Sequence, residues 1–382
     1  MRGEDRPGKQ LAIAHIMPWS GIGGVEIATL RMTEATRDRF HHIAFCLPDA
    51  ISLRNSFEQI GIETRVYFPP TPSLRHAVRF YKESKRLARQ LREDGVDIVH
   101  FSETAAAEPN SLAAYLAGAR ILCHVRNTYP HLSLHQRIPL YPIDQFIFVS
   151  QEARSQYALS FPDRKARVIY DAIELPPAEI SASGADVRHE LGIPIDCTVV
   201  GMVARVNPQK DYFTLASAAV TVLNKYPDTR FLIVGDNSLV DLNRRHYEEV
   251  SGKLTELGIA DRFIFTGHRD DVSRLISAMD ISVLSTHREG FGLCIAESMA
   301  MHKPVVATAV GGLLEVVQHG VTGYLHAHGN DQELADEIVS LIENPEEAQR
   351  LAMAGYEHVR QDYSRQGFIE EISKAYSDLM RR

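Results

Sequence analysis

The sequence predicts an α/β fold made of two doubly wound, Rossmann-like domains, and three observations support this. The 382 residues are enough for two or three domains of ordinary size. Short apolar runs alternate with longer amphipathic segments, which is typical of parallel sheets covered by helices on both faces. The alternation stops at a stretch rich in proline and serine near residues 171–187 and then begins again. We therefore expect a separate sheet on each side of that stretch.

The first series contains six short apolar runs that predict buried strands. These runs are Leu11–Met17, His42–Leu47, Thr64–Phe68, Asp97–Phe101, Ile121–Val125 and Gln145–Val149. Helical periodicity lies between several of them, at Val25–Thr36, Leu74–Arg92 and Gln151–Leu159.

The second series repeats the pattern with five predicted strands. These are Thr198–Ala204, Arg230–Val234, Phe263–Thr266, Ile281–Leu284 and Pro304–Ala307. The intervening helical stretches are Tyr212–Lys225, Leu239–Leu257, Asp271–Ala278 and Leu293–Ala300. Residues 331–382 are predicted to be helical, with no further strand.

Charge and composition exclude several classes of protein. Lys and Arg number 41 against 49 Asp and Glu, and this net charge of −8 excludes a generally basic nucleic-acid binder. Residues 1–185 carry a net charge of +2 and residues 186–382 one of −10, so the two halves are expected to have different partners. The 4 cysteines are scattered, as in a reducing compartment. With no visible secretory signal and no long apolar run, we expect a cytoplasmic protein, with attachment to the inner membrane face left open.

A glycine-rich turn, Ser20–Glu26, follows the first predicted strand and opens a helix. Glycines at such a place let backbone N–H groups approach an anion at the helix N-terminus. A dinucleotide fingerprint would need a third glycine where Glu26 stands, so a nicotinamide cofactor is not indicated. A phosphate contact and a plain tight turn remain as alternatives.

Two cations follow the first strand of the second series. Arg205 and Lys210 lie in the loop after that strand, where ligands of open α/β sheets bind. A guanidinium fork and an ammonium together suit a diphosphate. The alternative is a pair of solvated loop charges.

The most specific segment is Glu289–Glu297, between a predicted strand and a helix. Gly290 and Gly292 leave room for backbone N–H groups to point at phosphate, and the helix adds its positive N-terminal end. Glu289 precedes the helix and Glu297 lies inside it, so the two carboxylates are expected to have different roles, one with a sugar or ribose hydroxyl. The alternative is an exposed helix with two ordinary glutamates.

Residues 201–323 resemble the donor-binding domain of retaining glycosyltransferases of family 4, which have the GT-B fold. The matching segments are Gly201–Arg205 with Lys210, Phe231–Gly235, Thr266–His268, Glu289–Glu297, Pro304–Thr308, Gly311–Gly312 and Gly320–Gly323. The sequence departs from the family at Asp171 and at His302, where the family commonly has asparagine and glycine.

The resemblance implies two domains that face each other across a cleft. An N-terminal acceptor-binding domain would span residues 1–180 and be completed by a C-terminal helix within 363–382. A nucleotide-sugar donor-binding domain would span residues 186–362.

In the donor-binding domain, the resemblance implies that Arg205 and Lys210 hold the diphosphate. Glu289 would contact the transferred sugar and Glu297 the ribose hydroxyls. The backbone at Phe291, Gly292 and Leu293 would cap the phosphates, and the region around His268 would pack on the base. Gly235 and Gly290 complete the implied donor-binding residues of this domain. In the first domain, Gly23 and Gly24 would approach the phosphates or the acceptor, and His124 would contact the donor sugar.

The implied reaction is retaining transfer of a sugar from a UDP- or GDP-sugar to a saccharide or lipid-linked acceptor, in the synthesis of a cell-surface polysaccharide or glycoconjugate. The sequence has no Asp-x-Asp motif, so we expect no metal and no other cofactor, and Arg205 and Lys210 would neutralise the leaving diphosphate. Two alternatives are a nucleotide-sugar epimerase of the same fold and a catalytically silent nucleotide-sugar binding protein.

The segment Arg75–Arg92 predicts a basic amphipathic helix. Its cations are Arg75, Arg79, Lys82, Lys85, Arg86, Arg89 and Arg92. Such a helix can lie on an anionic membrane, and it can equally pack its apolar stripe on the sheet with a solvated basic face. The histidines at positions 41, 42, 131, 135, 326 and 328 lack a metal-ligand spacing and are interpreted as surface or structural residues.

Overall fold

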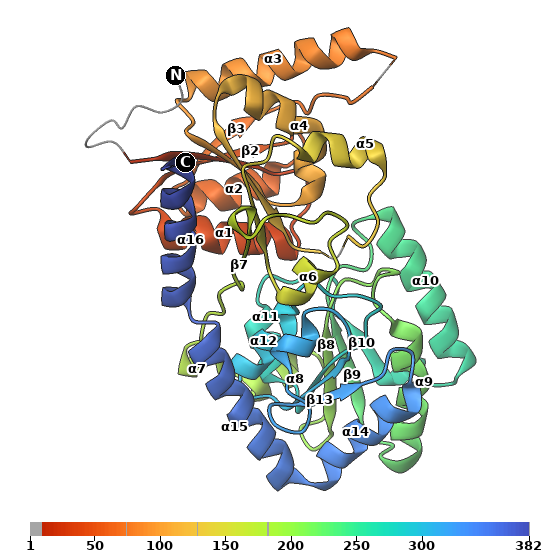
Figure 1. The fold of residues 1–382 in the computed structure, drawn as a ribbon. Helices are drawn as coiled ribbons and strands as arrows, with labels where there is room; N and C mark the ends of the chain where they lie inside the picture. Colours follow the sequence, from red (N-terminus) through yellow and green to blue (C-terminus); the bar gives the residue numbers. More distant parts are fainter. Residues whose placement is uncertain (1–9, 74, 128, 182, 382) are drawn as a thin grey trace. The chain divides into compact units, whose positions relative to one another are not determined.

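The computed structural model describes residues 10–73, 75–127, 129–181 and 183–381. The chain divides into two compact units (Figure 1). Unit 1 comprises Met1–Ala172 and Arg365–Arg382, and unit 2 comprises Ile173–Ser364. The first boundary lies earlier than residue 180, because the backbone N–H of Ile173 donates to the carbonyl of Tyr363 at 2.9 Å and so ties this part of the chain to unit 2.

Unit 1 is built on a parallel sheet of seven strands in the order β3-β2-β1-β4-β5-β6-β7. The strands are β1 (Ala12–Ile16), β2 (His41–Cys46), β3 (Glu63–Val66), β4 (Ile98–Phe101), β5 (Arg120–Val125), β6 (Gln145–Phe148) and β7 (Ala166–Val168). The helices are α1 (Gly24–Thr36), α2 (Ile51–Gln59), α3 (Ala77–Glu93), α4 (Thr104–Ala117), α5 (Leu134–Arg137), α6 (Gln151–Ser155) and α16 (Arg365–Met380). The predicted α/β class is confirmed.

Three predictions for unit 1 need correction. The run Thr64–Phe68 was expected to be a buried strand, but β3 is an edge strand and its residues are partly or fully exposed. The helix expected over Gln151–Leu159 ends at Ser155. The helix expected from Leu74 begins at Ala77, and Leu74 itself lies outside the described residues.

The C-terminal helix closes the core of unit 1. Residues of α16 pack with residues of β1, β4, β5 and β6 in one buried cluster: Ile13, Met32, Phe40, Ile98, Leu122, Ile147, Ile169, Phe368, Ile372, Ala375, Tyr376 and Leu379. The hydroxyl of Tyr376 lies 2.7 Å from Nδ1 of the buried His100 in β4. The last helix in the chain is therefore part of the first unit.

Unit 2 is built on a parallel sheet of six strands in the order β10-β9-β8-β11-β12-β13. The strands are β8 (Val199–Val203), β9 (Arg230–Val234), β10 (Phe263–Phe265), β11 (Ile281–Leu284), β12 (Val305–Thr308) and β13 (Tyr324–His326). The helices are α7 (Ala178–Ser181), α8 (Gly184–Glu190), α9 (Tyr212–Lys225), α10 (Asp241–Glu256), α11 (Val272–Ser277), α12 (Leu293–Ala300), α13 (Leu313–Val316), α14 (Asp331–Glu343) and α15 (Pro345–Asp362). Because all strand pairs are parallel, the carboxyl ends of the strands share one edge, where ligands of such sheets bind.

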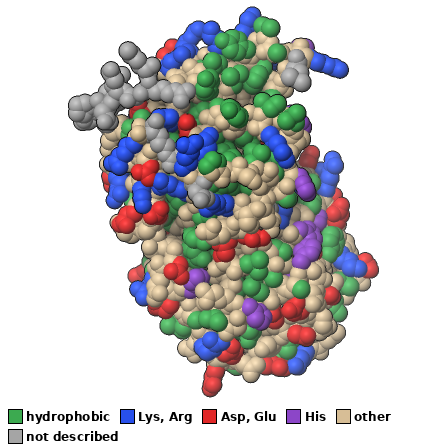
Figure 2. Space-filling view, viewed as in Figure 1, with side chains coloured by type: hydrophobic (Ala, Val, Ile, Leu, Met, Phe, Trp, Pro, Cys, Tyr) green, Lys and Arg blue, Asp and Glu red, His purple; other side chains and the backbone are tan. Residues whose placement is uncertain are grey.

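The surface of unit 1 combines basic and apolar side chains. Figure 2 shows Lys and Arg side chains next to hydrophobic ones at the top of the molecule, where Figure 1 places α3. Among the described residues, no helix combines the length and apolar character that crossing a membrane requires.

Candidate functional site

Two loops at the carboxyl edge of the unit 2 sheet pair with each other. The loop after β8 bonds to the loop after β11 through the backbone: the N–H of Asp211 donates to Ser285 at 3.0 Å, and the N–H of His287 donates to Gln209 at 3.0 Å. An antiparallel bridge between Lys210 and Thr286 lies between these bonds. This short ladder fixes the backbone on both sides of Lys210 and just before Glu289, the two predicted charges.

The side chains of Lys210 and Glu289 form an ion pair at this edge. The ammonium Nζ lies 2.5 Å from Oε2 of Glu289, and the side chains are only 14% and 18% exposed. Solvent and salt screen the attraction in such a pair far less than in a surface pair. The two residues that the sequence separates by 79 positions are therefore in direct contact.

Glycines let a third loop pack closely on the loop that carries Glu289. The N–H of Gly312 donates to the carbonyl of Glu289 at 3.0 Å. A Cβ on Gly311 would lie 1.9 Å from that carbonyl oxygen, and one on Gly312 would lie 2.2 Å from the oxygen of Gly290. Gly292 caps α12 with φ +99, a left-handed conformation that glycine adopts without strain. Close backbone packing thus fixes the position of the segment 289–292.

The beginning of α12 combines a buried aromatic ring with partly buried polar groups. The Phe291 ring is buried and packs edge-on against Tyr363, with 5.0 Å between ring centroids. Leu293 is the first helical residue, and Glu297 lies partly buried one turn later. Burial raises the pKa of the Cys294 thiol to about 12, so the neutral thiol, a weak nucleophile, predominates at pH 7.

The ends of β8, β9 and β10 meet beside the same edge. A Cβ on Gly235 would lie 2.3 Å from the carbonyl oxygen of Ala204, so only glycine allows the two strand ends to approach this closely. The N–H of Gly235 donates to Gly267 at 3.1 Å. His268 follows, with Nε2 at 3.3 Å from a carboxylate oxygen of the exposed Asp270.

Arg205 differs from Lys210 in its surroundings. Its side chain is exposed, and the guanidinium makes no hydrogen bond or ion pair with the described residues. The guanidinium is therefore available to an external anion. Nearby, Asp236 is held ionised, because burial opposes ionisation but the backbone N–H groups of Ser238 and Leu239 outweigh it and lower the pKa.

In unit 1, the predicted glycine turn lies at the start of α1. The N–H of Gly23 donates to Oε2 of Glu26 at 2.9 Å, which is one half of a capping box. Gly24 is exposed, and a Cβ built on it would meet no atom within 4 Å. The protein itself therefore has no steric need for glycine at position 24.

His124 lies in β5 and its side chain is fully buried. Its ring stacks on His100 with 5.5 Å between centroids, and its Nδ1 lies 3.4 Å from the guanidinium of Arg126. Burial, with Arg126 and His15 nearby, holds the pKa of His124 well below its usual value, so the ring is neutral at pH 7. The expected sugar contact of His124 stays a prediction.

Two polar groupings at the carboxyl edge of unit 1 were not predicted. Glu103, after β4, accepts hydrogen bonds from the N–H of Thr104 at 2.8 Å, from Asn127 at 2.9 Å and from the hydroxyl of Tyr129 at 3.0 Å. Burial raises its pKa. Arg126, after β5, forms a buried ion pair with Asp171. Each of these residues stands just after a strand, which is the signal that could have revealed them.

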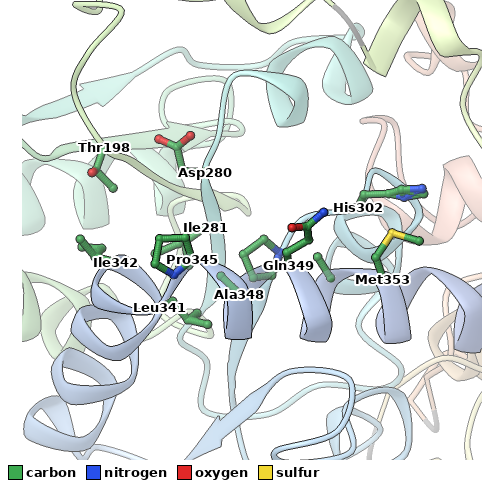
Figure 3. A pocket seen from close by; sticks show the side chains of 12 residues that line it. Thr198, Asp280, Ile281, His302, Leu341, Ile342, Pro345, Ala348, Gln349 and Met353 are labelled. Carbon is green, nitrogen blue, oxygen red and sulfur yellow. The ribbon is translucent and has the colours of Figure 1, made fainter.

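A cavity lies at the other edge of the unit 2 sheet. It measures about 550 Å³ and is lined by Thr198, Asp280, Ile281, His302, Pro304, Leu341, Ile342, Pro345, Ala348, Gln349, Ala352 and Met353 (Figure 3). Several of these residues stand at the amino ends of β8, β11 and β12. None of the predicted site residues lines this cavity.

Comparison with known families gives two matches along the chain. The family model described as "Glycosyltransferase Family 4" matches residues 22–175. The model described as "Glycosyl transferases group 1" matches residues 185–358 and so includes every predicted site residue of unit 2.

Curated relatives are similar over different lengths. The N-acetyl-alpha-D-glucosaminyl L-malate synthase of Bacillus anthracis is 23% identical, over 95% of this chain and 96% of the relative. The D-inositol 3-phosphate glycosyltransferase of Corynebacterium urealyticum is 32% identical over 57% of this chain. The matched part covers about half (53%) of that relative.

Among solved structures, Anabaena Alr3699/HepE in complex with UDP-glucose has a TM-score of 0.85 at 23% identity. The match covers 96% of this chain and 100% of that one. The likeness confirms the predicted GT-B fold, with two Rossmann-like domains.

Proposed function

Because the chain belongs to the glycosyltransferases of family 4, we propose that it moves a sugar from a nucleotide-sugar donor to a saccharide or lipid-linked acceptor with retention of configuration. The observation that carries this proposal is the Lys210–Glu289 ion pair next to the glycine loop that opens α12. A cation, a carboxylate and the backbone N–H groups at the start of a helix lie at one sheet edge, and they suit the diphosphate and the sugar hydroxyls of an activated sugar.

In the proposed reaction, charge builds up on the diphosphate as the glycosidic bond breaks. Lys210 and the exposed guanidinium of Arg205 would neutralise it, with the N-terminal N–H groups of α12 as further donors. These groups take the place of a divalent metal on an Asp-x-Asp motif, which the sequence lacks. We therefore propose that transfer needs no metal.

The position of Glu289 supports a role in binding rather than as a nucleophile. Its carboxylate is already engaged by Lys210, which disfavours attack on an anomeric carbon. We propose that Glu289 orients Lys210 and accepts a hydrogen bond from a sugar hydroxyl. The acceptor hydroxyl would attack from the side on which the diphosphate leaves, with a diphosphate oxygen taking its proton.

Within the donor site, Glu297 would accept hydrogen bonds from the ribose hydroxyls, and the backbone at Gly290 to Leu293 would cap the phosphates. Gly235 and His268 would lie near the base. The relative from Anabaena was solved with UDP-glucose. A UDP-sugar is therefore the first donor to test, and a GDP-sugar the second.

The experiment that tests this function measures nucleoside diphosphate release. The purified chain is incubated with UDP-, GDP- and ADP-sugars, with and without saccharide and lipid-linked acceptors, and with a chelator. We expect thermal stabilisation by one donor class and acceptor-dependent diphosphate release that the chelator leaves unchanged. Donor binding without release would indicate a silent binding protein, and a changed sugar without transfer would indicate an epimerase.

For a lipid-linked acceptor, we propose that α3 contacts an anionic membrane. Its C-terminal half is buried through Leu87, Ala88 and Leu91, but its N-terminal half exposes Val78 (70%) and Tyr81 (47%). Basic side chains along α3 are exposed: Arg79, Lys82, Lys85, Arg86 and Arg89. Exposed apolar groups among cations are typical of a helix that lies at a membrane surface.

Co-sedimentation with vesicles tests the membrane contact. We expect binding to vesicles with phosphatidylserine, weak binding to neutral vesicles, and loss of binding in high salt. The double variant Val78→Ser/Tyr81→Ser should bind anionic vesicles less well, whereas Ile195→Ser, an exposed apolar residue of unit 2, should not change binding. Absence of binding to anionic vesicles would rule this contact out.

A further inference from the structure

Three side chains of metal-ligating types lie close together beside the loop ladder that carries Lys210. Asp211 caps the N-terminus of α9, His287 follows β11, and His328 follows β13. Nδ1 of His287 lies 2.7 Å from Nε2 of His328 and 3.9 Å from Oδ2 of Asp211. One ligand atom from each residue lies within 4.8 Å of the other two. The proposed sugar transfer uses none of these three side chains.

The ladder itself explains why Asp211 and His287 share a face. Along two paired extended segments, side chains alternate between the two sides. Lys210 pairs with Thr286, so the residues that follow them, Asp211 and His287, both point to the opposite side. The backbone bonds from Asp211 to Ser285 and from His287 to Gln209 hold the two in place.

The spacing suits a small divalent transition metal. Zn²⁺ binds imidazole nitrogen and carboxylate oxygen at about 2.0–2.2 Å, and tetrahedral geometry then separates two ligand nitrogens by about 3.3 Å. A small outward movement of the exposed His328 would reach this spacing from the observed 2.7 Å. A donor set of two imidazoles and one carboxylate also favours Zn²⁺ over Mg²⁺ or Ca²⁺.

The carboxylate of Asp211 is oriented for such a role. It is buried, and its two oxygens accept hydrogen bonds from the N–H of Thr214 at 3.1 Å and from the Thr214 hydroxyl at 2.6 Å. A carboxylate oxygen has two lone pairs, so one remains on Oδ2 for a metal. Hydrogen bonds that orient a ligand in this way are a regular feature of metal sites.

The charges around the cluster do not block a cation. The ammonium of Lys210, which precedes Asp211 in the chain, is engaged by Glu289. Side-chain exposure of His287 is 46% and His328 is exposed, so a metal can enter from solvent. We propose that Asp211, His287 and His328 form a site for a divalent transition metal, with Zn²⁺ as the best match and water as the fourth ligand.

The expected role of this metal is to link elements of unit 2. It would tie the end of β13 to the two paired loops after β8 and β11, which are far apart in sequence. Binding to the folded unit only stabilises that unit by mass action. The inference does not depend on the proposed sugar transfer, and its test does not use activity.

The test uses the chain without a polyhistidine tag, after treatment with a chelator. At a Zn²⁺ concentration about 100 times its Kd, the unfolding temperature of unit 2 should rise by roughly 5–10 °C. Co²⁺ should give the visible absorption bands of a tetrahedral site. His287→Ala and His328→Ala should each abolish both signals, and Asp211→Asn, which keeps the helix cap, should weaken them.

The matched control is His189→Ala, which removes an exposed histidine elsewhere in unit 2 and should retain both signals. Unfolding temperatures without metal should be alike for the histidine variants and the parent, since these side chains are exposed. Equal metal binding by the double variant His287→Ala/His328→Ala would overturn the proposal, as would a parent chain that Zn²⁺ does not stabilise.

Discussion

Lys210 and Glu289 are the two side chains on which the proposed function depends most. Lys210→Ala and Glu289→Ala should each lower the rate of diphosphate release by about 10²–10³-fold, because Lys210 neutralises the charge that develops in the transition state and Glu289 orients Lys210 and the sugar. Steady-state kinetics with the best donor and acceptor measure this loss. The control is Lys253→Ala, which breaks an exposed pair with Glu256 on α10 and should leave the rate unchanged.

Both variants leave one member of a largely buried ion pair without its partner, so folding must be checked before a loss of activity is assigned to catalysis. Circular dichroism and unfolding temperature must therefore stay close to those of the parent. A folded Lys210→Ala or Glu289→Ala protein with parental turnover would remove these residues from the site.

Gly24 and Gly312 should respond to alanine in opposite ways. Alanine at 24 has free space at the first helical position, so Gly24→Ala should keep or slightly raise the free energy of unfolding. If the turn meets the donor or acceptor, this variant should still raise KM, because the added methyl blocks close approach. Alanine at 312 would place Cβ 2.2 Å from the oxygen of Gly290, so Gly312→Ala should destabilise unit 2.

Urea unfolding and steady-state kinetics on both variants check this pair of expectations. We expect a loss of about 1–3 kcal/mol for Gly312→Ala, in the range of overpacked sites. An unchanged KM for Gly24→Ala would assign that glycine to the turn alone.

Sequence alone predicted the position of single charges better than their contacts. Strand-end placement located Arg205, Lys210 and Glu289 at one edge, because parallel strands end there. The contact of His328 with His287 was missed, since it depends on the lateral order of β11, β12 and β13, which periodicity does not give. His302, where the family commonly has glycine, adopts φ +54, so the backbone has the left-handed conformation that favours glycine although the residue is a histidine.

At the scale of elements, amphipathic segments with polar boundaries were predicted well. The helices over Tyr212–Lys225 and Leu293–Ala300 have the predicted ends. The helix α4 was missed because its alanine-rich sequence is buried on most sides and has little periodicity. The strands β7 and β13 were missed because three residues are too few to show alternation.

The helix α16 should be essential for the stability of unit 1. Ile372 is fully buried in the core that α16 shares with the sheet, so Ile372→Ala should lower the free energy of unfolding by about 2–5 kcal/mol. Glu371→Ala, at the neighbouring exposed position, should change it by less than about 0.5 kcal/mol. Denaturant unfolding with a probe in unit 1 measures both, and equal effects would contradict the observed packing of α16.

At the scale of the whole molecule, the two units differ in their buried titratable groups. Four neutral histidines lie in a row on neighbouring strands of unit 1: His42 in β2, His15 in β1, His100 in β4 and His124 in β5. Successive rings lie 5.0, 5.1 and 5.5 Å apart. Burial holds the pKa of His15, His100 and His124 well below the usual value and lowers that of His42 to about 3.

Acid should therefore destabilise unit 1 steeply. Below pH 6.5 the unfolded chain takes up protons that the native histidines do not, so the free energy of unfolding falls by up to about 1.4 kcal/mol per histidine per pH unit. The loss continues toward pH 3. The pKa of the buried Glu103 is raised, so the native state takes up one proton before the unfolded chain does, and this offsets the uptake by one histidine at most. In unit 2, burial raises the pKa of Glu337 to about 8, which favours the folded unit as pH falls from 8 toward 4.5.

Urea unfolding between pH 7.5 and 5, with one probe in each unit, checks this difference. His15→Gln should reduce the dependence of unit 1 on pH by about one proton, whatever its effect on stability at pH 7.5. A parent unit 1 whose stability is flat over this range would mean that the four rings are protonated or solvated in the native state.

The route of the chain also has a consequence for biosynthesis. Unit 2 is one uninterrupted stretch that is complete once Ser364 has been made, whereas unit 1 lacks part of its core until Arg365–Met380 has left the ribosome. Domains usually fold in the order in which they are translated. Here the unit whose synthesis begins first must wait, with an apolar face of its sheet uncovered, until α16 has emerged as well. Nascent chains that stall before α16 are for this reason the ones most exposed to chaperones and proteases.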